Sequence, residues 1–329
     1  MQELNLDVVV TRGDHVESHH HVLAAVVDGA GRLVAASGDV ERATFWRSCA
    51  KPFQLMPLLE TGGFDELPWE LDELALACAS HGGEPEHVAV AESMLQDLGR
   101  EEGDLVCGPH EPLAPRGARI ARESGIRLSR LHNNCSGKHA AMLALAHTQG
   151  WSMDGYERPG HPVQVAAAER VAQWTGVAEE RLLRATDGCG VVVFGMPLIN
   201  MALAYARLAS AVARRDEVPS RIVGAIRSRP HLFAGTDRFD TVLLEETDGR
   251  VVAKIGAEGV HSLALLDAGL GLVVKVEDGA TRAQMPAVLR ALQLLGALPD
   301  VLPQRLAEIM VRPVRNTRGE IVGAVGPAA

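Results

Sequence analysis

Two serine and lysine combinations in this sequence could supply the nucleophile of a hydrolase. Residues 47–52 read Arg-Ser-Cys-Ala-Lys-Pro, so Ser48 and Lys51 would share one face of a helix. Pro52 fits the first turn of a helix, which predicts a helix that begins near Ser48. The free N–H groups at such a helix start can stabilise an oxyanion, and a neutral lysine beside them can take the serine proton. The SxxK spacing also arises by chance in exposed helices, so by itself it does not establish catalysis.

Ser80 and Lys254 provide a second serine and a second lysine. Residues 75–79 are small and apolar and are followed by Ser-His-Gly-Gly, a pattern typical of a helix that ends and delivers Ser80 into a glycine-rich loop. Lys254 lies in an apolar stretch typical of a strand, where a buried lysine must be neutral or paired. Two plainer interpretations stay open: local hydrogen bonding at Ser80, and an edge-strand lysine that reaches solvent at Lys254.

Cysteine and lysine side chains in two polar segments suggest a metal site. Cys135 and Lys138 come directly before an apolar helix, and Cys189 lies in a tight glycine-bearing turn. Two cysteines and a neutral lysine can hold Zn²⁺ with water in the open position, although no CxxC spacing supports the site and buried free cysteines are common. The five cysteines are an odd number, which favours free thiols or metal ligands over a disulfide framework.

The elements that must position these residues follow one another in an order typical of an α+β fold. Apolar, β-branched runs within residues 6–37 predict antiparallel strands, and the segment from residue 52 to 98 has helical periodicity. The other expected elements are helices over 140–146, 163–174, 191–213 and 282–295, and strands over 241–244, 251–255, 262–266, 272–277 and 321–325. This order predicts an antiparallel sheet flanked by helices, together with a helical lobe.

We expect one compact domain with two lobes. The sheet lobe would comprise about residues 1–45 and 235–329, and the mainly helical lobe about residues 46–234.

The composition of the 329-residue chain disfavours several classes of partner. The sequence has no apolar stretch long enough to cross a bilayer, so no membrane partner is expected. A net charge of -10 without clustered Lys and Arg disfavours nucleic acid and favours a small-molecule substrate. The amino terminus lacks the features of a secretory signal, so a cytoplasmic location is expected.

Taken together, these motifs resemble the rhizobial-type L-asparaginase family, also called asparaginase II-like. The resemblance runs nearly end to end and is carried by residues 12–13, 16–18 with the histidines after them, 47–54, 80–85, 133–139, 161–164, 187–190 and 254–259. It implies a fold similar to serine β-lactamases and related glutaminases, a homodimer, and no organic cofactor. The sequence departs from the family at Val192, near which relatives often have proline.

The resemblance also implies roles for particular residues. It implies two pairs, Ser48 with Lys51 and Ser80 with Lys254, a zinc site at Cys135, Lys138 and Cys189, and Asp187 near the substrate. Charge complementarity to a zwitterionic amino acid adds Arg47, which could pair with the substrate carboxylate, while Asp187 could pair with the amino group. The zinc ion would be structural, substrate-binding or modulatory.

The expected reaction is hydrolysis of the side-chain amide of L-asparagine to L-aspartate and ammonia. Ser48 is the favoured nucleophile, with Ser80 and Lys254 relaying protons or orienting the first pair, and the reverse assignment stays open. Two alternatives also stay open: a glutaminase or β-lactamase-like serine hydrolase, and a non-catalytic relative that binds an amino acid or a metal.

Three consecutive histidines at residues 19–21 exceed what the family pattern needs. We interpret them as strand and surface polarity rather than as a second metal site, because three consecutive side chains cannot share one face of a strand.

Overall fold

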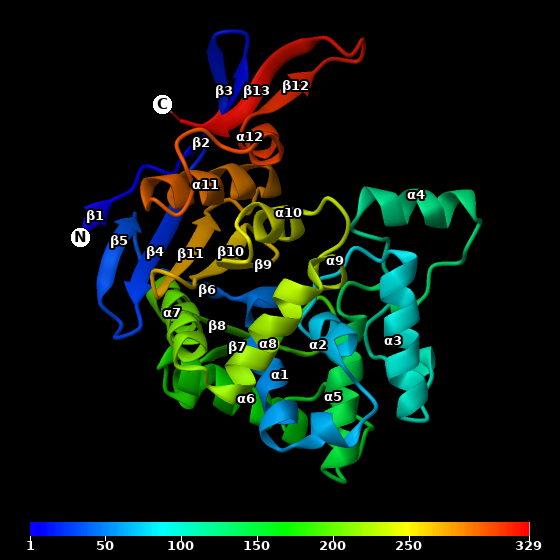
Figure 1. The fold of residues 1–329 in the computed structure, drawn as a ribbon. Helices are drawn as coiled ribbons and strands as arrows, with labels where there is room; N and C mark the ends of the chain where they lie inside the picture. The colour runs from blue at the N-terminus through cyan, green and yellow to red at the C-terminus, as the bar shows by residue number, and fades with distance from the viewer. Residues whose placement is uncertain (329) are drawn as a thin grey trace. The chain divides into compact units, whose positions relative to one another are not determined.

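The structure (Figure 1) is a computed structural model that describes residues 1–328. The chain divides into two compact units. The first unit comprises Met1–Cys49, Met196–Ala213 and Val242–Ala329, and the second comprises Ala50–Gly195 and Arg214–Thr241. Residues 196–213, which the sequence analysis placed in the helical lobe, therefore group with the first unit.

The first unit contains a six-stranded sheet in the order β1-β5-β4-β11-β10-β9. Its strands are β1 (Gln2–Glu3), β4 (Val22–Asp28), β5 (Leu33–Ser37), β9 (Val251–Ile255), β10 (Val260–Leu265) and β11 (Leu270–Val276). Neighbouring strands run antiparallel except β1 and β5, which are parallel. The helix α7 (Leu198–Arg214) packs closely on this sheet. The closeness is seen at Gly271 of β11, where an added Cβ would lie 1.9 Å from the Ala202 carbonyl oxygen. Another helix, α11 (Thr281–Leu294), contacts β10 and β11.

A second, four-stranded antiparallel sheet joins the two ends of the chain within the first unit (Figure 1). Its order is β12-β13-β2-β3, with β2 (Val8–Arg12), β3 (His15–His20), β12 (Arg312–Arg315) and β13 (Ile321–Pro327). The helices α11 and α12 (Gln304–Met310) contact β13. The strand β6 (Ala43–Phe45) and the short 3-10 helix η1 (Arg47–Ala50) follow the first strands along the chain.

The second unit is mainly helical. Its elements are α1 (Lys51–Glu60), η2 (Gly63–Glu66), α2 (Leu71–Ala77), α3 (Pro85–Asp97), η3 (Glu102–Asp104), α4 (Pro115–Glu123), η4 (Arg130–His132), α5 (Ser136–Thr148), α6 (Pro162–Thr175), η5 (Glu179–Arg181), β7 (Leu183–Thr186), α8 (Glu217–Ser228), α9 (Pro230–Phe233) and most of β8 (Val192–Pro197). The helix α1 is buried from Lys51 to Leu59 and contacts α5, α6 and α8, so its polar side chains Lys51 and Gln54 are buried together with the apolar ones. Antiparallel pairing of β7 with β8 completes the unit.

The structure confirms the α+β class with antiparallel sheets and helices. The strands expected within residues 6–37 are β2 to β5, and the other confirmed strands are β9, β10, β11 and β13. No helix among the described residues is long and apolar enough to cross a membrane.

Two of the expected elements were wrong. Residues 241–244 belong to a helix, α10 (Phe239–Glu246). A strand was expected there because a short, mainly apolar run has no periodicity that distinguishes a strand from a helix. Residues 191–213 do not form one helix, because the β-branched run at their start forms β8 and α7 begins only at Leu198.

Candidate active site and metal centre

Ser48 lies in η1, directly before α1. The helix α1 begins at Lys51 with a proline in its first turn, as the spacing predicts, and Ser48 is half-buried. The residue before it, Arg47, has a φ of 55°, in the left-handed region that non-glycine residues rarely adopt. Backbone conformations of this kind concentrate at functional sites, so the turn at Arg47 supports a functional role for this segment.

Within the first unit, the segment that carries Ser48 packs against the end of β9 that carries Lys254. The Cys49 thiol donates to the Lys254 carbonyl oxygen at 3.0 Å. The two segments approach closely at Gly256, where an added Cβ would lie 3.0 Å from Cys49 Sγ and 3.2 Å from the carbonyl oxygen of Trp46. Lys254 is 1% exposed, and its Nζ donates to the Ile255 carbonyl oxygen at 3.0 Å. The expected buried lysine is therefore present.

In the second unit, the structure brings Lys51 and Ser80 together. Lys51 is 1% exposed, and its Nζ donates to Ser80 Oγ at 3.1 Å. The same Nζ donates to the carbonyl oxygens of Ala79 at 2.5 Å and Asn134 at 3.2 Å. Ser80 lies in the loop after α2, which ends at Ala77 as predicted. A buried lysine and a buried hydroxyl thus share one hydrogen bond.

The four predicted catalytic residues are divided between the units. Ser48 and Lys254 belong to the first unit, and Lys51 and Ser80 belong to the second. The expected pairs, Ser48 with Lys51 and Ser80 with Lys254, each join residues of different units and stay predictions.

His81 fixes the loop that carries Ser80. Its Nδ1 accepts from the Gly83 N–H at 3.1 Å, so its Nε2 carries the proton and donates to Ser136 Oγ at 2.8 Å. The ring stacks on that of His87 with 4.9 Å between the ring centroids. Burial, followed by the charge of His87, lowers the pKa of His81 well below its ordinary value, which keeps the ring neutral. The bond from His81 to Ser136 joins residues that are 55 positions apart, so the local sequence around Ser80 does not reveal it.

The three predicted metal ligands also lie together in the second unit. Lys138 Nζ lies 3.0 Å from Cys189 Sγ, and all three side chains are at most 5% exposed. A hydrogen bond from the Cys135 thiol, aided by Lys138, lowers the pKa of Cys189 to about 5. The same hydrogen bond, together with burial, raises the pKa of Cys135 to about 12. Cys189 is therefore a thiolate at neutral pH.

This donor set fits a zinc ion. Thiolate sulfur and nitrogen are the donors that Zn²⁺ prefers, and three protein ligands would leave one position open. Burial lowers the pKa of Lys138, but the nearby Cys189 and Cys135 sulfurs outweigh it and raise that pKa overall. Zinc would therefore have to release protons from Lys138 and Cys135 on binding.

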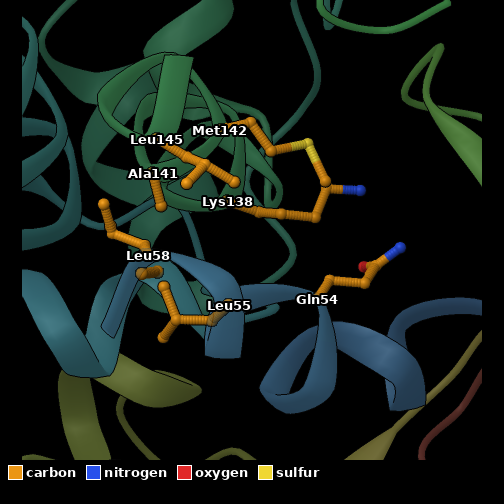
Figure 2. A pocket seen from close by; sticks show the side chains of 8 residues that line it. Gln54, Leu55, Leu58, Lys138, Ala141, Met142 and Leu145 are labelled. Atoms are coloured by element: carbon orange, nitrogen blue, oxygen red, sulfur yellow. The ribbon is translucent and has the colours of Figure 1, made fainter. Parts of the chain in front are cut away.

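The stem of Lys138 lies among apolar side chains. A cavity of about 10 Å³ is lined by Gln54, Leu55, Leu58, Ala77, Lys138, Ala141, Met142 and Leu145. Figure 2 shows the α5 side chains of this set facing those of α1 across the cavity. A space of this size holds at most about one water. The Lys138 stem is therefore packed in the interior of the second unit, and its ammonium group contacts Cys189 Sγ.

Asp187 occupies the turn between β7 and β8. Its N–H donates to the Val191 carbonyl oxygen at 2.8 Å, and Gly190 has a φ of 94° that closes the turn. The carboxylate oxygen Oδ2 lies 3.9 Å from Cys189 Sγ. The departure at Val192 is accommodated by a regular strand, because Val192 pairs with Thr186. Substrate-binding roles for Asp187 and Arg47 stay predictions.

Sequence reasoning did not single out three other residues of the second unit. Asn134 contacts both the Lys51 and Ser80 pair and the predicted metal ligands. Its carbonyl oxygen accepts from Lys51, and its Oδ1 accepts from the Cys135 thiol at 3.1 Å. Burial raises the pKa of Cys107 to about 12, with further contributions from Cys135 and Cys189. The Nε2 of His139 has no hydrogen-bond partner within residues 1–328. Asn134 was visible as part of a polar segment before α5, but nothing in its sequence position indicated its two partners.

The chain matches the model of one protein family along nearly its whole length. The family is L-asparaginase II, and the match covers residues 8–327. No curated protein matches the chain significantly.

Several solved structures are similar to the chain, all at low identity. A mutant of simvastatin synthase (LovD) from Aspergillus terreus is 13% identical, with a TM-score of 0.43 over 84% of this chain and 90% of that chain. Mglu in its glutamate form is 15% identical, with a TM-score of 0.38, and the match covers 84% of this chain but 61% of the Mglu chain. A β-lactamase from Mycobacterium bovis is 13% identical, with a TM-score of 0.34 over 84% and 96% of the two chains. TM-scores below 0.5 are too low to assign a function.

Proposed function

The chain belongs to the L-asparaginase II family, and from that premise we propose that it hydrolyses the side-chain amide of L-asparagine to L-aspartate and ammonia. Membership of the family makes the chain an amidohydrolase. The observation that carries the finer proposal is the buried contact of 3.1 Å between Lys51 Nζ and Ser80 Oγ. A serine needs a base within this distance to act on an amide near neutral pH.

The proposed reaction has two steps. A serine hydroxyl attacks the amide carbon, a neutral lysine takes the hydroxyl proton, and an ester bond forms as the carbon–nitrogen bond breaks. The lysine returns the proton to the leaving nitrogen, which departs as ammonia. Water then attacks the ester carbon and gives a proton to the lysine, the carbon–oxygen bond to the serine breaks, and the lysine returns that proton to the serine oxygen as L-aspartate leaves.

Ser48 is proposed as the attacking residue. It is half-buried in a turn with a strained residue before it, whereas Ser80 is 4% exposed. Lys51 would then take the proton, and Ser80 and Lys254 would relay it or orient Ser48 and Lys51. The observed partner of Lys51 favours the reverse assignment, in which Ser80 attacks, and the experiment below separates the two.

Arg47, Asp187 and the metal would surround the substrate. The guanidinium of Arg47 suits the substrate carboxylate, and the carboxylate of Asp187 suits the amino group. Cys135, Lys138 and Cys189 would hold Zn²⁺, which supplies positive charge when bound. The contact of Asp187 with Cys189 supports an influence of the metal on substrate binding.

The test measures ammonia release by the purified full chain from L-asparagine and L-glutamine, and ring opening of a chromogenic β-lactam by its change in absorbance. We expect turnover of L-asparagine, and a loss of about 10⁴-fold or more in kcat/KM for Ser48→Ala. Ser93→Ala is a matched control, because Ser93 is exposed on α3. Mass spectrometry of a trapped acyl-enzyme identifies the esterified serine.

Three other outcomes would overturn parts of the proposal. Full turnover by Ser48→Ala together with an ester on Ser80 would reverse the serine roles. Faster turnover of glutamine or of the β-lactam would make the chain a glutaminase or a β-lactamase-like hydrolase. A rise in Tm with L-asparagine but without ammonia release would indicate a binding protein.

A further inference from the structure

The consecutive histidines 19–21 lie at the end of β3, with His21 directly after its last residue, and their side chains divide between two faces. His20 is buried, and its Nδ1 lies 2.6 Å from the Asp278 carboxylate. His19 and His21 point the other way and lie together, with 4.6 Å between their ring centroids. The alternation of a strand thus separates His20 from the other two, as the sequence argument requires, but leaves two imidazoles on one face.

A carboxylate completes this face. Asp7 Oδ2 lies 3.0 Å from His21 Nδ1 and 3.8 Å from His19 Nε2. All three ligand atoms lie within 4.8 Å of one another. In a tetrahedral zinc site with bonds of about 2.0–2.1 Å, ligand atoms are about 3.3 Å apart, so the ring positions need only a small adjustment.

The carboxylate is held in this orientation by the main chain. Asp7 Oδ1 accepts from the Val22 N–H at 2.9 Å, which leaves Oδ2 directed at the two rings. Next to the cluster, the carbonyl oxygen of His21 accepts from the Glu277 N–H at 2.9 Å, which ties the end of β3 to the neighbouring segment. Fixed orientation of a ligating carboxylate by a second hydrogen bond is a common feature of metal sites.

We propose that Asp7, His19 and His21 form a binding site for a divalent transition metal of the zinc class. Two imidazole nitrogens and one carboxylate oxygen suit Zn²⁺, Co²⁺ or Ni²⁺ better than Ca²⁺ or Mg²⁺, which prefer oxygen alone. The side chains of His19 and His21 are 42% and 67% exposed, so an ion can enter directly from solvent and keep water in its remaining positions. The site belongs wholly to the first unit and differs in its donors from the cysteine and lysine cluster of the second unit.

The experiment is a calorimetric titration of zinc into the metal-free full chain. We expect the double variant His19→Ala/His21→Ala to bind one equivalent less than the wild type, and each single variant to weaken that equivalent about tenfold or more. Asp7→Asn keeps an oxygen for the Val22 N–H but removes the charge, so it should also weaken binding. His15→Ala is the matched control, because His15 is exposed on the same strand and lies outside the cluster.

Cobalt separates this site from the sulfur-containing one. Co²⁺ bound by thiolates gives a charge-transfer absorption that a site of two imidazoles and a carboxylate does not give. The double variant should lose a cobalt equivalent without losing any of this absorption. An unchanged stoichiometry in His19→Ala/His21→Ala would overturn the proposal, whatever the sulfur-containing cluster or the amidase assay shows.

Discussion

Two buried lysines of the second unit differ in what surrounds their ammonium groups. Lys51 donates to two main-chain carbonyl oxygens and to Ser80 Oγ, and none of these three acceptors carries a formal charge. Lys138 donates to the sulfur of Cys189, whose pKa is lowered to about 5. One lysine therefore shares a hydrogen bond with a hydroxyl, and the other faces a thiolate.

The difference teaches that burial alone does not decide what a lysine can do. A lysine held by neutral oxygens can exchange its proton with a hydroxyl beside it, which suits a general base. A lysine beside an anion keeps its proton until another cation takes over the charge, which suits a site that a metal completes. Asn134 contacts both arrangements, through its carbonyl oxygen on Lys51 and its side chain on Cys135.

The largest expected effect separates the two lysines by activity. Lys51→Met keeps the apolar stem and removes the amine, so we expect ammonia release from L-asparagine to fall by about 10²–10⁴-fold. Circular dichroism and Tm would check that the variant is folded. A kcat within tenfold of the wild-type value would exclude Lys51 as the base and would remove the distinction between the two lysines.

A buried lysine outside the candidate site provides the control. Lys275 is 9% exposed and donates to the carbonyl oxygen of Glu258 at 2.8 Å, in the first unit and outside the candidate site. Lys275→Met should lower stability and leave kcat close to the wild-type value. Equal losses of kcat in Lys51→Met and Lys275→Met would show that the loss of a buried lysine, and not the loss of a base beside Ser80, lowers the activity.

Much of the fold could be predicted from the sequence, because hydrophobic period and turn residues are local signals. The strands within residues 6–37 alternate or carry β-branched runs between glycine turns, and they are strands in the structure. The strand expected over residues 241–244 was wrong because a run of four residues, of which three are apolar, is too short to show a period. The segment from 191 failed because a strand and a helix follow one another without a break in hydrophobicity.

The candidate site was predicted less completely, because its contacts join residues far apart in the chain. The grouping of Cys135, Lys138 and Cys189 was implied by the family resemblance, and the structure brings them together. The observed partner of Lys51 is Ser80, which lies in a different motif, so local spacing could not reveal it. The double role of Asn134 depends on the path of the loop before α5 and leaves no pattern in the sequence.

The second prediction separates the lysines by metal content. Lys138→Met removes one donor and the counter-ion of Cys189, so zinc affinity should fall about tenfold or more. The free energy of unfolding should fall by about 1–3 kcal/mol at pH 7, less than for most broken buried ion pairs, because the Cys189 thiolate can take up a proton. Zinc titration and urea unfolding measure both effects.

Lys51→Met is the reciprocal control for this second prediction. It should keep the zinc equivalent of the sulfur-containing cluster while losing ammonia release, and Lys138→Met should show the larger loss of zinc. If both variants lost zinc and activity to the same extent, the two lysines would belong to one functional unit and the comparison would fail.

The smallest expected effect comes from an exposed ion pair that sets a scale for the buried one. The Arg116 guanidinium donates two hydrogen bonds to Glu86, at 3.0 and 2.9 Å, and lowers the pKa of that carboxyl from 4.5 to about 2. A lowered pKa stabilises the fold above pH 4.5, and this contribution is lost as the pH falls towards 2. Because Glu86 is largely exposed, solvent screening limits the contribution to about 0.5–1 kcal/mol.

Glu86→Gln should therefore lower the urea midpoint at pH 7 and have a smaller effect at pH 3. The control is Glu66→Gln, which changes an exposed carboxyl of the same unit outside this pair and should alter the urea midpoint little at either pH. A loss in Glu86→Gln that equalled that of Lys138→Met would mean that burial adds nothing to the Lys138 and Cys189 pair.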